Sequence, residues 1–447
     1  MSKSGKANIS LDSGFHFDEV DPKSSNVTQA ETHKLLSLFP HLGALLATTT
    51  PLSGQTDAVS EPLGDLIGFV NQVDPTQGLV FAGTGFNTIF RPQSPQTPTP
   101  LPVPVPGSDN ILELNLTTET LSFAAPLGSV PNRGSGTQGD IFLNAVPYVQ
   151  SISDVTTLPA TGIHFEPGMW LAVPPTTLPP ETQTIYTRMA SIPHGVTINA
   201  QGISLGRTAG KVPFANITVN INPFPIGGAQ NPPSQPFFPS QTVTNQNTAR
   251  IPQNLAPFAT TITQAMLDNP NVVLANEIAS QNMQSFVTLI ITTDAAGLLP
   301  TPPPNPTTPP APPVTKPPGF GGGTDDIAFL LGDNNTPPKK PNANAFKMTA
   351  VFWIETILQS IVVPPCKANG LPITIQAAPV AGSSLRPTFT LTPPYDILQP
   401  TTITVSYIQI QYSQSVFLNF NGLTWPHVSV ATLIPADPIV VPASVWP

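Results

Sequence analysis

The chain has 447 residues, with 16 basic and 25 acidic side chains and a net charge of −9 when histidine is neutral. Proline accounts for 59 residues, and because proline lacks a backbone N–H and fixes φ, this density excludes a mainly helical protein. The few basic residues form no stripe that could follow a phosphate backbone, so the composition argues against a nucleic-acid partner.

The sequence carries no recognisable export or membrane signal. Its first residues, MSKSGKANISLDSGFHFDEV, lack an apolar stretch before a cleavage site, and no run of about 18 apolar residues occurs. The one cysteine, Cys366, allows no disulfide within the chain. We therefore expect a soluble cytoplasmic protein without a membrane span, and export by a route other than Sec stays open.

The first 75 residues contain two segments with apolar residues at helical spacing, THKLLSLFPHLGALLA (32–47) and SEPLGDLIGFVNQV (60–73). Ser60 and Glu61 at the start of the second are typical of a helix N-terminus. The sequence thus predicts an N-terminal helical segment, 1–75, packed on a larger domain at 79–447.

From residue 79 the pattern changes to period-two alternation rich in Thr, Val and Ile, which is typical of half-buried antiparallel strands. The segments with this pattern are 79–91, 110–124, 140–155, 162–174, 184–193, 195–202, 214–224, 284–294, 345–357, 386–393, 402–420 and 423–435. Hairpin turns are predicted within 115–121 and at Asn421-Gly422. About a dozen strands in hairpin order predict an up-and-down antiparallel barrel or a sandwich.

Three other segments interrupt the strand pattern. Residues 258–282 are predicted to be a helical insertion, broken near Asn269-Pro270, that covers one face or end of the sheet. The segments 91–107 and 298–323 are rich in proline and are expected to form extended, polyproline-II-like loops.

Three histidines lie in the strand-rich part of the chain: His164, His194 and His427. Alternation in the last strand places His427 and Ser429 on one face and Val428 on the other. An imidazole that faces an apolar cavity is a suitable axial ligand for haem iron. A core histidine bonded to a backbone carbonyl is the alternative.

The segment 162–202 is the densest in chemically active side chains. A polar patch inside an otherwise apolar barrel is one interpretation of His164, Glu166, Arg188 and His194, because a carboxylate can orient a histidine and an arginine can hold an anionic group. The other interpretation is that Glu166 and Arg188 pair across neighbouring strands and only satisfy each other.

Four motifs carry a resemblance to a known family: GTGFN (83–87), GIHFEPGMWLAVP (162–174), RMASIPHGVTINAQG (188–202) and LTWPHVSVATL (423–433). With these motifs the chain resembles the calycin-type haem-binding β-barrels, a group similar to nitrobindin. The resemblance implies a large antiparallel up-and-down barrel of calycin or lipocalin type that binds haem b. His427 of the Pro-His pair would be its axial iron ligand.

The same resemblance implies roles for further residues. His194 or His164 would be the acid or base on the distal side of the haem, and Arg188 would stabilise charge there. The other residues expected at the haem are Trp425, Met189 and Trp170. An activity of this kind would be a haem-dependent, peroxidase-like or isomerase reaction.

Three functions remain open on the sequence alone. The first is a haem protein that acts on peroxide, nitric oxide or oxygen. The second is a haem-free carrier or enzyme that binds an apolar small molecule in the barrel cavity. The third is a structural, self-assembling protein in which long strands such as 402–420 associate edge to edge, and a homo-oligomer is compatible with all three.

Overall fold

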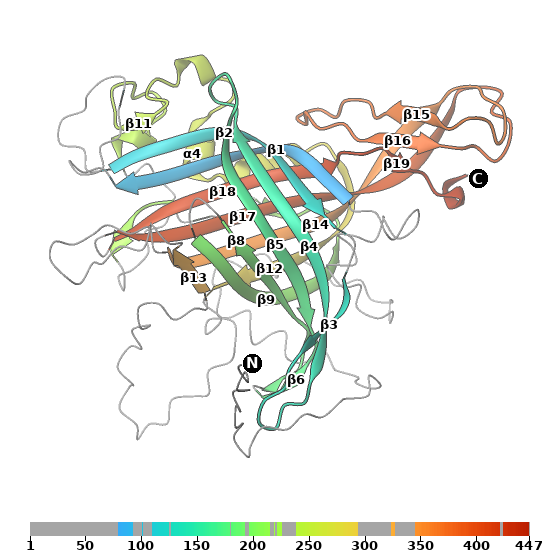
Figure 1. Cartoon of the computed structure of the whole chain (residues 1–447). Coiled ribbons are helices and arrows are strands. Elements are labelled where there is room, and N and C mark those ends of the chain that lie inside the picture. The colour runs from blue at the N-terminus through green and yellow to red at the C-terminus, as the bar shows by residue number, and fades with distance from the viewer. Residues whose placement is uncertain are drawn as a thin grey trace, which may run out of the picture.

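In a computed structural model, the chain forms a closed, ten-stranded antiparallel β-barrel (Figure 1). The structure describes residues 79–92, 101, 110–124, 127–178, 180–192, 196–214, 219, 221–225, 238–293, 323–326, 345–420 and 423–446. The barrel strands are β1 (Leu79–Pro92), β2 (Asn110–Phe123), β4 (Ile141–Asp154), β5 (Thr161–Val173), β8 (Ile185–Ser191), β9 (Val196–Ala209), β12 (Asn282–Thr292), β14 (Ala345–Val363), β17 (Thr401–Phe420) and β18 (Leu423–Pro435).

The barrel strands pair in chain order. Each barrel strand pairs with the next barrel strand along the chain, beginning with β1 and β2 and then β2 and β4, and β18 returns to β1 to close the barrel. All of these pairs are antiparallel, so the prediction of a mainly β, up-and-down antiparallel barrel is confirmed. β17 pairs with β14 from Thr401 to Leu418 and with β18 from Ile410 to Phe420, so the C-terminal half of this long strand has both edges occupied.

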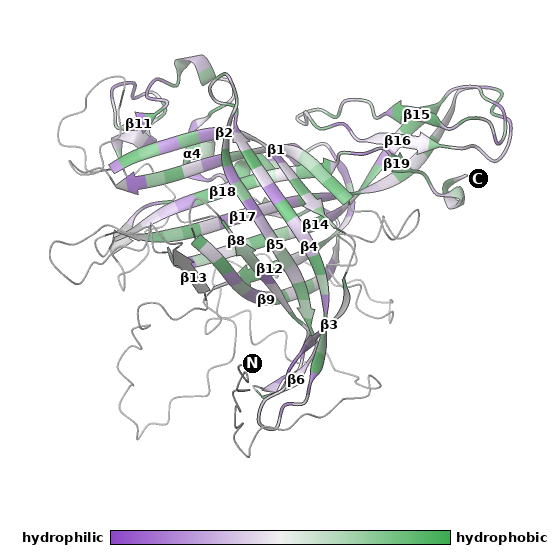
Figure 2. Cartoon of the chain, viewed as in Figure 1, coloured by the Kyte–Doolittle hydropathy of each residue, from purple (hydrophilic) through white to green (hydrophobic). Residues whose placement is uncertain are grey.

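Alternation of polar and apolar residues is what specifies these strands, and it is visible along them in Figure 2. The Asn421-Gly422 hairpin is confirmed, because β17 ends at Phe420, β18 begins at Leu423, and these two residues pair. The hairpin predicted within 115–121 is wrong, since β2 runs without interruption from Asn110 to Phe123. That segment contains no Gly, Pro or Asn-Gly at its centre, and its period-two pattern continues through it.

The strand predicted at 214–224 is also wrong in extent. Among its described residues, only Phe224 belongs to a strand, the two-residue β10 (Phe224–Pro225), which pairs with β18. Several short strands lie outside the set of ten barrel strands. They are β3 (Gly128–Asn132), β6 (Thr176–Thr177), β7 (Pro180–Glu181), β11 (Arg250–Ile251), β13 (Gly323–Asp326) and a separate sheet of β15 (Ile373–Gln376), β16 (Thr388–Leu391) and β19 (Ile439–Val440).

A long connection between β9 and β12 covers part of the outside of the barrel. It contains α4 (Gln264–Asp268) and α5 (Asn271–Ile278), with the single-turn helices η5 (Pro239–Gln241) and η6 (Ala256–Phe258) before them. Thr263 caps α4 by accepting a hydrogen bond from the Met266 N–H, and Pro270 separates the two helices. A helical stretch broken at Asn269-Pro270 is therefore present within 258–282, as expected.

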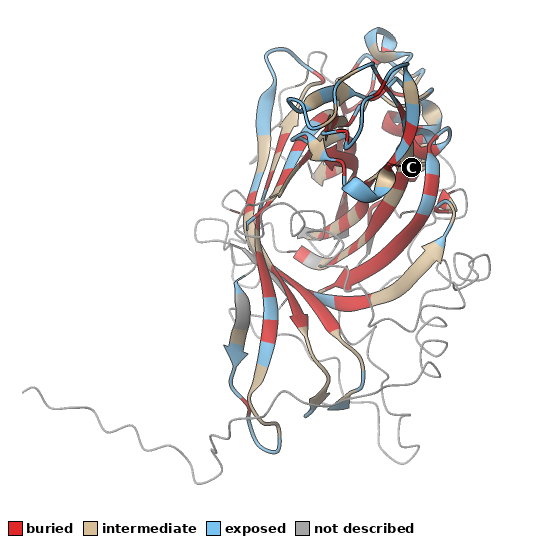
Figure 3. Cartoon of the chain, turned by 90° about the vertical axis from the view of Figure 1, so that its right-hand side faces the viewer, coloured by how far each residue is buried: buried red, intermediate tan, exposed pale blue. Residues whose placement is uncertain are grey.

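The two largest of three apolar clusters among the described residues hold the fold together, one inside the barrel and one outside it. The outer cluster lies between the barrel wall, α4, α5 and the β15–β16–β19 sheet, and includes Leu274, Trp353 and Val430. The inner cluster fills part of the lumen and includes Phe81, Trp170 and Leu433. Figure 3 shows the buried residues concentrated along the barrel strands, with exposed residues at the loop ends.

A buried acid group lies in the outer cluster, beneath α5. Gln409 donates to Glu355 Oε2 at 2.8 Å and exchanges hydrogen bonds with Gln281. Burial, the largest effect, raises the pKa of Glu355 well above its usual value, and the nearby Glu277 carboxyl raises it further. The buried site therefore favours the protonated form of Glu355.

The two expected N-terminal helices lie outside the described residues, as do nearly all positions of the two proline-rich segments. The described strand ends nevertheless fix where those segments connect. Segment 91–107 joins β1 to β2, and 298–323 lies between β12 and β14. Because neighbouring strands are antiparallel, both connections leave from the same end of the barrel.

Candidate functional site

The lumen is filled with aromatic side chains over about half of its length. The rings form a chain of contacts with centroid separations between 5.2 and 6.5 Å, made by Phe81, Phe123, Tyr148, Trp170, Phe352 and Tyr412. Such edge-on and tilted contacts stabilise beyond simple burial. The Tyr148 and Tyr412 hydroxyls bring this apolar half into contact with a polar layer in the middle of the barrel.

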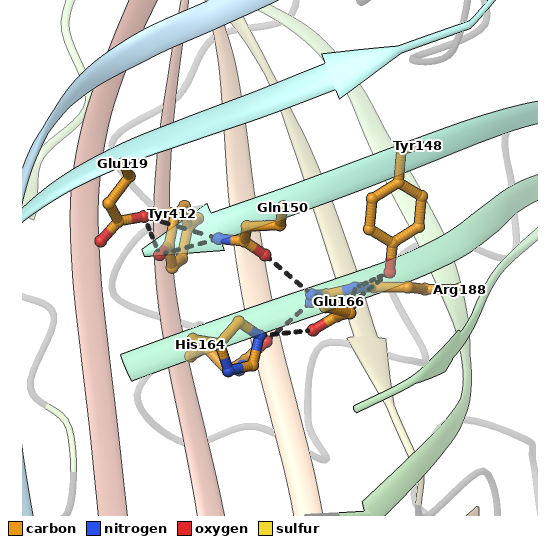
Figure 4. A network of polar contacts seen from close by, with 8 residues as sticks. Glu119, Tyr148, Gln150, His164, Glu166, Arg188 and Tyr412 are labelled. Carbon is orange, nitrogen blue, oxygen red and sulfur yellow. Dashed lines mark hydrogen bonds and ion pairs between the residues drawn. The ribbon is translucent and has the colours of Figure 1, made fainter. Parts of the chain in front are cut away.

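An ion pair forms the centre of the polar layer (Figure 4). Glu166 on β5 and Arg188 on β8 are both almost completely buried, and Glu166 Oε1 accepts hydrogen bonds from Arg188 Nη2 and, at 3.0 Å, from Arg188 Nε. The Tyr148 hydroxyl donates to the same carboxylate oxygen. These partners satisfy a charged pair that would otherwise be costly to bury.

Every nitrogen of the Arg188 guanidinium is bound within the layer. Nη1 donates to Gln414 Oε1 at 2.7 Å, and Nη2 donates to Gln150 Oε1 at 3.2 Å in addition to Glu166. The guanidinium carbon also lies 5.6 Å from the ring centroids of Tyr148 and Phe352, within the range of cation–π attraction. Arg188 therefore positions other side chains and has no nitrogen left without a partner.

A second carboxylate, Glu119 on β2, continues the layer across the lumen. The Tyr412 hydroxyl donates to Glu119 Oε2 at 2.5 Å, and Thr117 donates to Oε1 at 2.9 Å. Gln150 joins the two halves of the layer, because its Nε2 donates to the Tyr412 hydroxyl at 3.1 Å while its Oε1 accepts from Arg188. The network thus runs unbroken from β2 to β8.

The two carboxylates have opposite pKa shifts. Burial would raise the pKa of Glu166, but the positive charge of Arg188, followed by the contacts with His164 and Tyr148, lowers it to about 2. For Glu119 burial is the dominant effect and raises the pKa, because its hydrogen bonds with Tyr412 and Thr117 compensate only in part. The layer therefore contains an ionised and a more easily protonated acid side by side.

His164 connects the polar layer to the open part of the lumen. Its Nε2 lies 3.1 Å from Glu166 Oε2, and its side chain also lines a cavity. The carboxylate fixes the orientation of the imidazole, as carboxylates beside functional histidines commonly do. His164 is the member of the Glu166–Arg188 centre that a ligand in the cavity can touch.

Two glycines in the motifs noted above make room for this layer. A Cβ on Gly85 would lie 2.4 Å from the Val430 carbonyl oxygen and 2.7 Å from Glu119 Oε1. A Cβ on Gly168 would lie 2.7 Å from the ring of Tyr148. The glycines of the GTG and EPG sequences therefore lack a side chain where the buried polar network needs the space.

Substituting Gly85 with alanine should therefore destabilise the barrel by about 1–3 kcal/mol, the usual cost of overpacking. The added methyl group must displace either the β18 backbone or the Glu119 carboxylate. Urea unfolding measures the effect. Gly162→Ala is the matched control, since a Cβ there meets nothing within 4 Å, and equal stability losses in the two variants would contradict the steric argument.

The other half of the lumen contains a cavity of about 490 Å³. Gln150, His164, Tyr412 and Gln414 form its floor, on the surface of the polar layer. One side is aliphatic, made by Ile152, Ile192, Val196, Ile198, Met348 and Val416. The opposite side, on β18, β1 and β2, is polar and is made by Asn87, Arg91, Glu113, Asn115, His427 and Ser429.

The cavity lies toward the barrel end from which both proline-rich connections leave. Arg91, near the end of β1, and Glu113, near the start of β2, line it and form an ion pair at 3.4 Å. The β13 strand extends the wall at this end by pairing with β9 from Val196 to Asn199. Segments 91–107 and 298–323 thus connect strands around the cavity end of the barrel.

His427 lies on the polar side of the cavity, on the same face of β18 as Ser429, Ala431 and Leu433. Burial lowers its pKa to about 4, and the positive charge of Arg91 contributes, while a backbone hydrogen bond with Phe90 has the opposite effect. The imidazole is therefore neutral at pH 7. Its Nε2 has no hydrogen-bond partner among the described residues.

The structure places the other predicted site residues apart from the cavity lining. Arg188 lies behind His164 in the polar layer, and Trp170 belongs to the aromatic half of the lumen. Met189 is exposed at 46% and points away from the lumen, whereas Trp425 is buried in the outer cluster. His194 lies outside the described residues. Of the expected residues that the structure describes, His164 and His427 line the cavity.

Comparison with protein-family models, curated proteins and solved structures finds no match to the chain. Among the described residues, no helix combines the length and apolar character needed to cross a bilayer. Those residues also contain no group of three or more His, Cys, Asp and Glu side chains arranged to hold a metal ion. The cavity is therefore the feature of the described chain that bears most directly on function.

Proposed function

We propose that the barrel binds a small, predominantly apolar molecule in the 490 Å³ cavity of its lumen. The observation that carries this proposal is the lining: aliphatic side chains cover one side, and a few polar groups are concentrated on the floor and the opposite side. Small-molecule sites typically combine such an apolar surface with a few placed polar groups, and their volumes fall in the same range. Lipocalin-like barrels bind ligands in this way.

The polar layer supports the proposal by giving the cavity a rigid floor. Gln150 and Gln414 each accept a hydrogen bond from Arg188, and Tyr412 is bound to Glu119. These contacts fix the floor side chains before a ligand arrives, so little conformational entropy is lost on binding. The floor also separates a ligand from the aromatic half of the lumen.

A titration with the neutral, environment-sensitive dye Nile red tests the proposal. We expect saturable fluorescence enhancement at one dye per chain. Val416→Phe, which puts a ring into the cavity, should weaken binding at least tenfold, whereas Val149→Phe, on the exposed outer face of β4, should not. Dye binding that is non-saturable, or that is equally affected by both variants, would show that the cavity is not the site.

A haem-binding, nitrobindin-like function is the second candidate, and one observation favours it. His427 offers a neutral imidazole whose Nε2 has no hydrogen-bond partner in the described part of the chain, while the ring is held by the Phe90 backbone. This combination suits an axial iron ligand. His427 would hold the iron of haem b, with His164 at the floor of the same cavity.

Haem, when bound, would supply the chemistry on peroxide, nitric oxide or oxygen, including any peroxidase-like reaction. The contribution of the chain would be to position it: His427 would bind the iron, the aliphatic side would exclude water, and His164, oriented by Glu166, would hold a proton at the floor of the cavity. Arg188 would act only through Glu166, because its nitrogens are bound in the polar layer.

Titration with hemin, followed from 300 to 700 nm, distinguishes the two candidates. The haem function requires a Soret band that saturates at one haem per chain and is lost in His427→Ala but retained in Ser429→Ala, a neighbouring change on the same face. A flat spectrum alongside saturable Nile red binding would reject haem and leave the apolar-ligand function.

A further inference from the structure

The polar side of the cavity is built on three neighbouring strands, and several of its buried polar atoms have no hydrogen-bond partner among the described residues. Asn87 on β1 lies directly opposite Asn115 on β2 and Ser429 on β18, and His427 lies opposite Ile89 one step nearer the barrel end. Asn87 is only 4% exposed and Asn115 2%. We refer to Asn87, Asn115 and His427 as the acceptor wall.

Each member of the acceptor wall has an atom without a hydrogen-bond partner within the described residues: Asn87 Oδ1, Asn115 Oδ1 and His427 Nε2. Buried polar atoms are nearly always paired, so three such atoms on one side of one cavity call for a binding partner. Arg91 Nε is a further atom of this kind in the same cavity, and the remaining ones belong to residues that do not line it.

The chemical character of the Asn115 and His427 atoms follows from their neighbours. Asn115 Nδ2 donates to Asp154 Oδ2 at 3.1 Å and to Glu113 Oε1 at 3.5 Å, which assigns its other amide atom as the carbonyl oxygen. The Phe90 backbone hydrogen bond favours the protonated His427 ring and so involves a carbonyl acceptor. With one ring N–H used there, Nε2 of the neutral imidazole is left as an acceptor.

A nearby hydrogen-bond donor, Arg91, adds a second condition that the bound group must meet. Arg91 lines the same side, and its buried Nε also has no hydrogen-bond partner among the residues that the structure describes, although the guanidinium pairs with Glu113 through Nη1 at 3.4 Å. A hydroxyl group can both donate to a wall acceptor and accept from Arg91. An ammonium cannot accept, and a carboxylate cannot donate and would lie near Glu113 and Asp154.

We propose that the molecule bound in the cavity is an apolar alcohol whose hydroxyl group donates to one atom of the acceptor wall and accepts a hydrogen bond from Arg91 Nε. The proposal rests on the proposed function, that the cavity takes a mainly apolar ligand, and adds the chemical class of that ligand. The aliphatic side of the cavity would contact its hydrocarbon body, and the acceptor wall would select its head group over a charged one.

Displacement of Nile red by three probes with the same chain length tests this inference: 1-decanol, decylamine and decanoate. We expect decanol to displace the dye at a concentration at least tenfold lower than either charged probe. The preference should fall to less than threefold in Asn87→Leu, which replaces the amide with an apolar group of similar size. Asn144→Leu, at an exposed position on β4, is the matched control and should keep the full preference.

His427→Phe provides an independent variant in case Asn87→Leu does not fold, and it should reduce the preference for decanol in the same direction. Equal displacement by the three probes, or tighter binding of decylamine or decanoate, would overturn the inference while Nile red binding upholds the proposed function. Absence of any dye binding would instead reject the proposed function, and the alcohol proposal with it.

Discussion

Arg188→Met is expected to destabilise the barrel by about 3–5 kcal/mol, the usual cost of removing one partner of a buried ion pair. The substitution leaves the Glu166 carboxylate in the lumen without its compensating charge, and it also removes the donors to Gln150 and Gln414. Urea or thermal unfolding measures the loss. Arg133→Met is the matched control, because that arginine pairs with Asp140 at the surface, where such pairs contribute at most about 1 kcal/mol.

The double variant Arg188→Met/Glu166→Gln distinguishes the stability that comes from the ion pair from the stability that comes from side-chain packing. Once the carboxylate is neutral, the absence of Arg188 costs less, so the double variant should be more stable than Arg188→Met alone. Additive losses from the two substitutions would contradict the view that Glu166 and Arg188 act as one unit.

Glu355→Gln is expected to stabilise the protein at neutral and alkaline pH and to leave its stability unchanged in acid. The pKa of Glu355 is raised in the folded protein, first by burial and then by Glu277. Above the ordinary carboxyl value of 4.5, unfolding therefore releases a proton from Glu355, and wild-type stability falls as pH rises, by up to about 1.4 kcal/mol per pH unit for one proton. Glutamine has no proton to release.

Stability curves of both proteins between pH 4 and 9 test this expectation. The difference should be absent near pH 4 and grow with pH until Glu355 ionises in the folded protein. Asp396→Asn provides a control of opposite sign, because the Ala368 N–H and Lys367 lower the pKa of Asp396. The stability that ionised Asp396 contributes to the folded protein should therefore be lost as pH falls, and Asp396→Asn should lack this dependence. Parallel curves for wild type and Glu355→Gln would show that Glu355 is not protonated in the folded state.

Strand positions were predictable from the sequence because each barrel strand has one face toward a packed lumen. Residues 402–420 and 423–435 alternate so regularly that β17 and β18 begin within one residue of the expected positions. The same alternation put His427 and Ser429 on one face, and both line the cavity. Local pattern is sufficient here because side-chain direction in a strand depends only on the period of two.

The same rule contained a signal for Glu119 that the predicted turn at 115–121 concealed. Continuing the alternation from Asn115 places Thr117 and Glu119 on one face of a single strand, and that is the lumen face in the structure. The GTG motif was a second signal, since Gly85 leaves the space that the Glu119 carboxylate occupies.

The contacts that assemble the site across the barrel could not be predicted from alternation along the strands. Gln150 contacts Tyr412 from a position 262 residues away in sequence, and Glu119 contacts it across 293 residues. These contacts depend on which strands close the barrel, and alternation does not contain that information. Alternation did contain the answer for Met189, because it follows Arg188, which faces the lumen, and its side chain is accordingly exposed. Trp425 belongs to the outer cluster although it lies two residues from His427, so alternation alone did not predict its place.

Pairing of β1 with β18 joins the first and last strands of the barrel, and the acceptor wall lies across this seam. Asn87 is on one side of it and His427 on the other, so neither half of the chain contains the wall by itself. Because joining distant segments is slow and entropically costly, the seam is expected to close late in folding. A ligand hydroxyl bound between β1 and β18 would then stabilise the closed barrel, because it would bind only when the two strands are paired and would slow their separation.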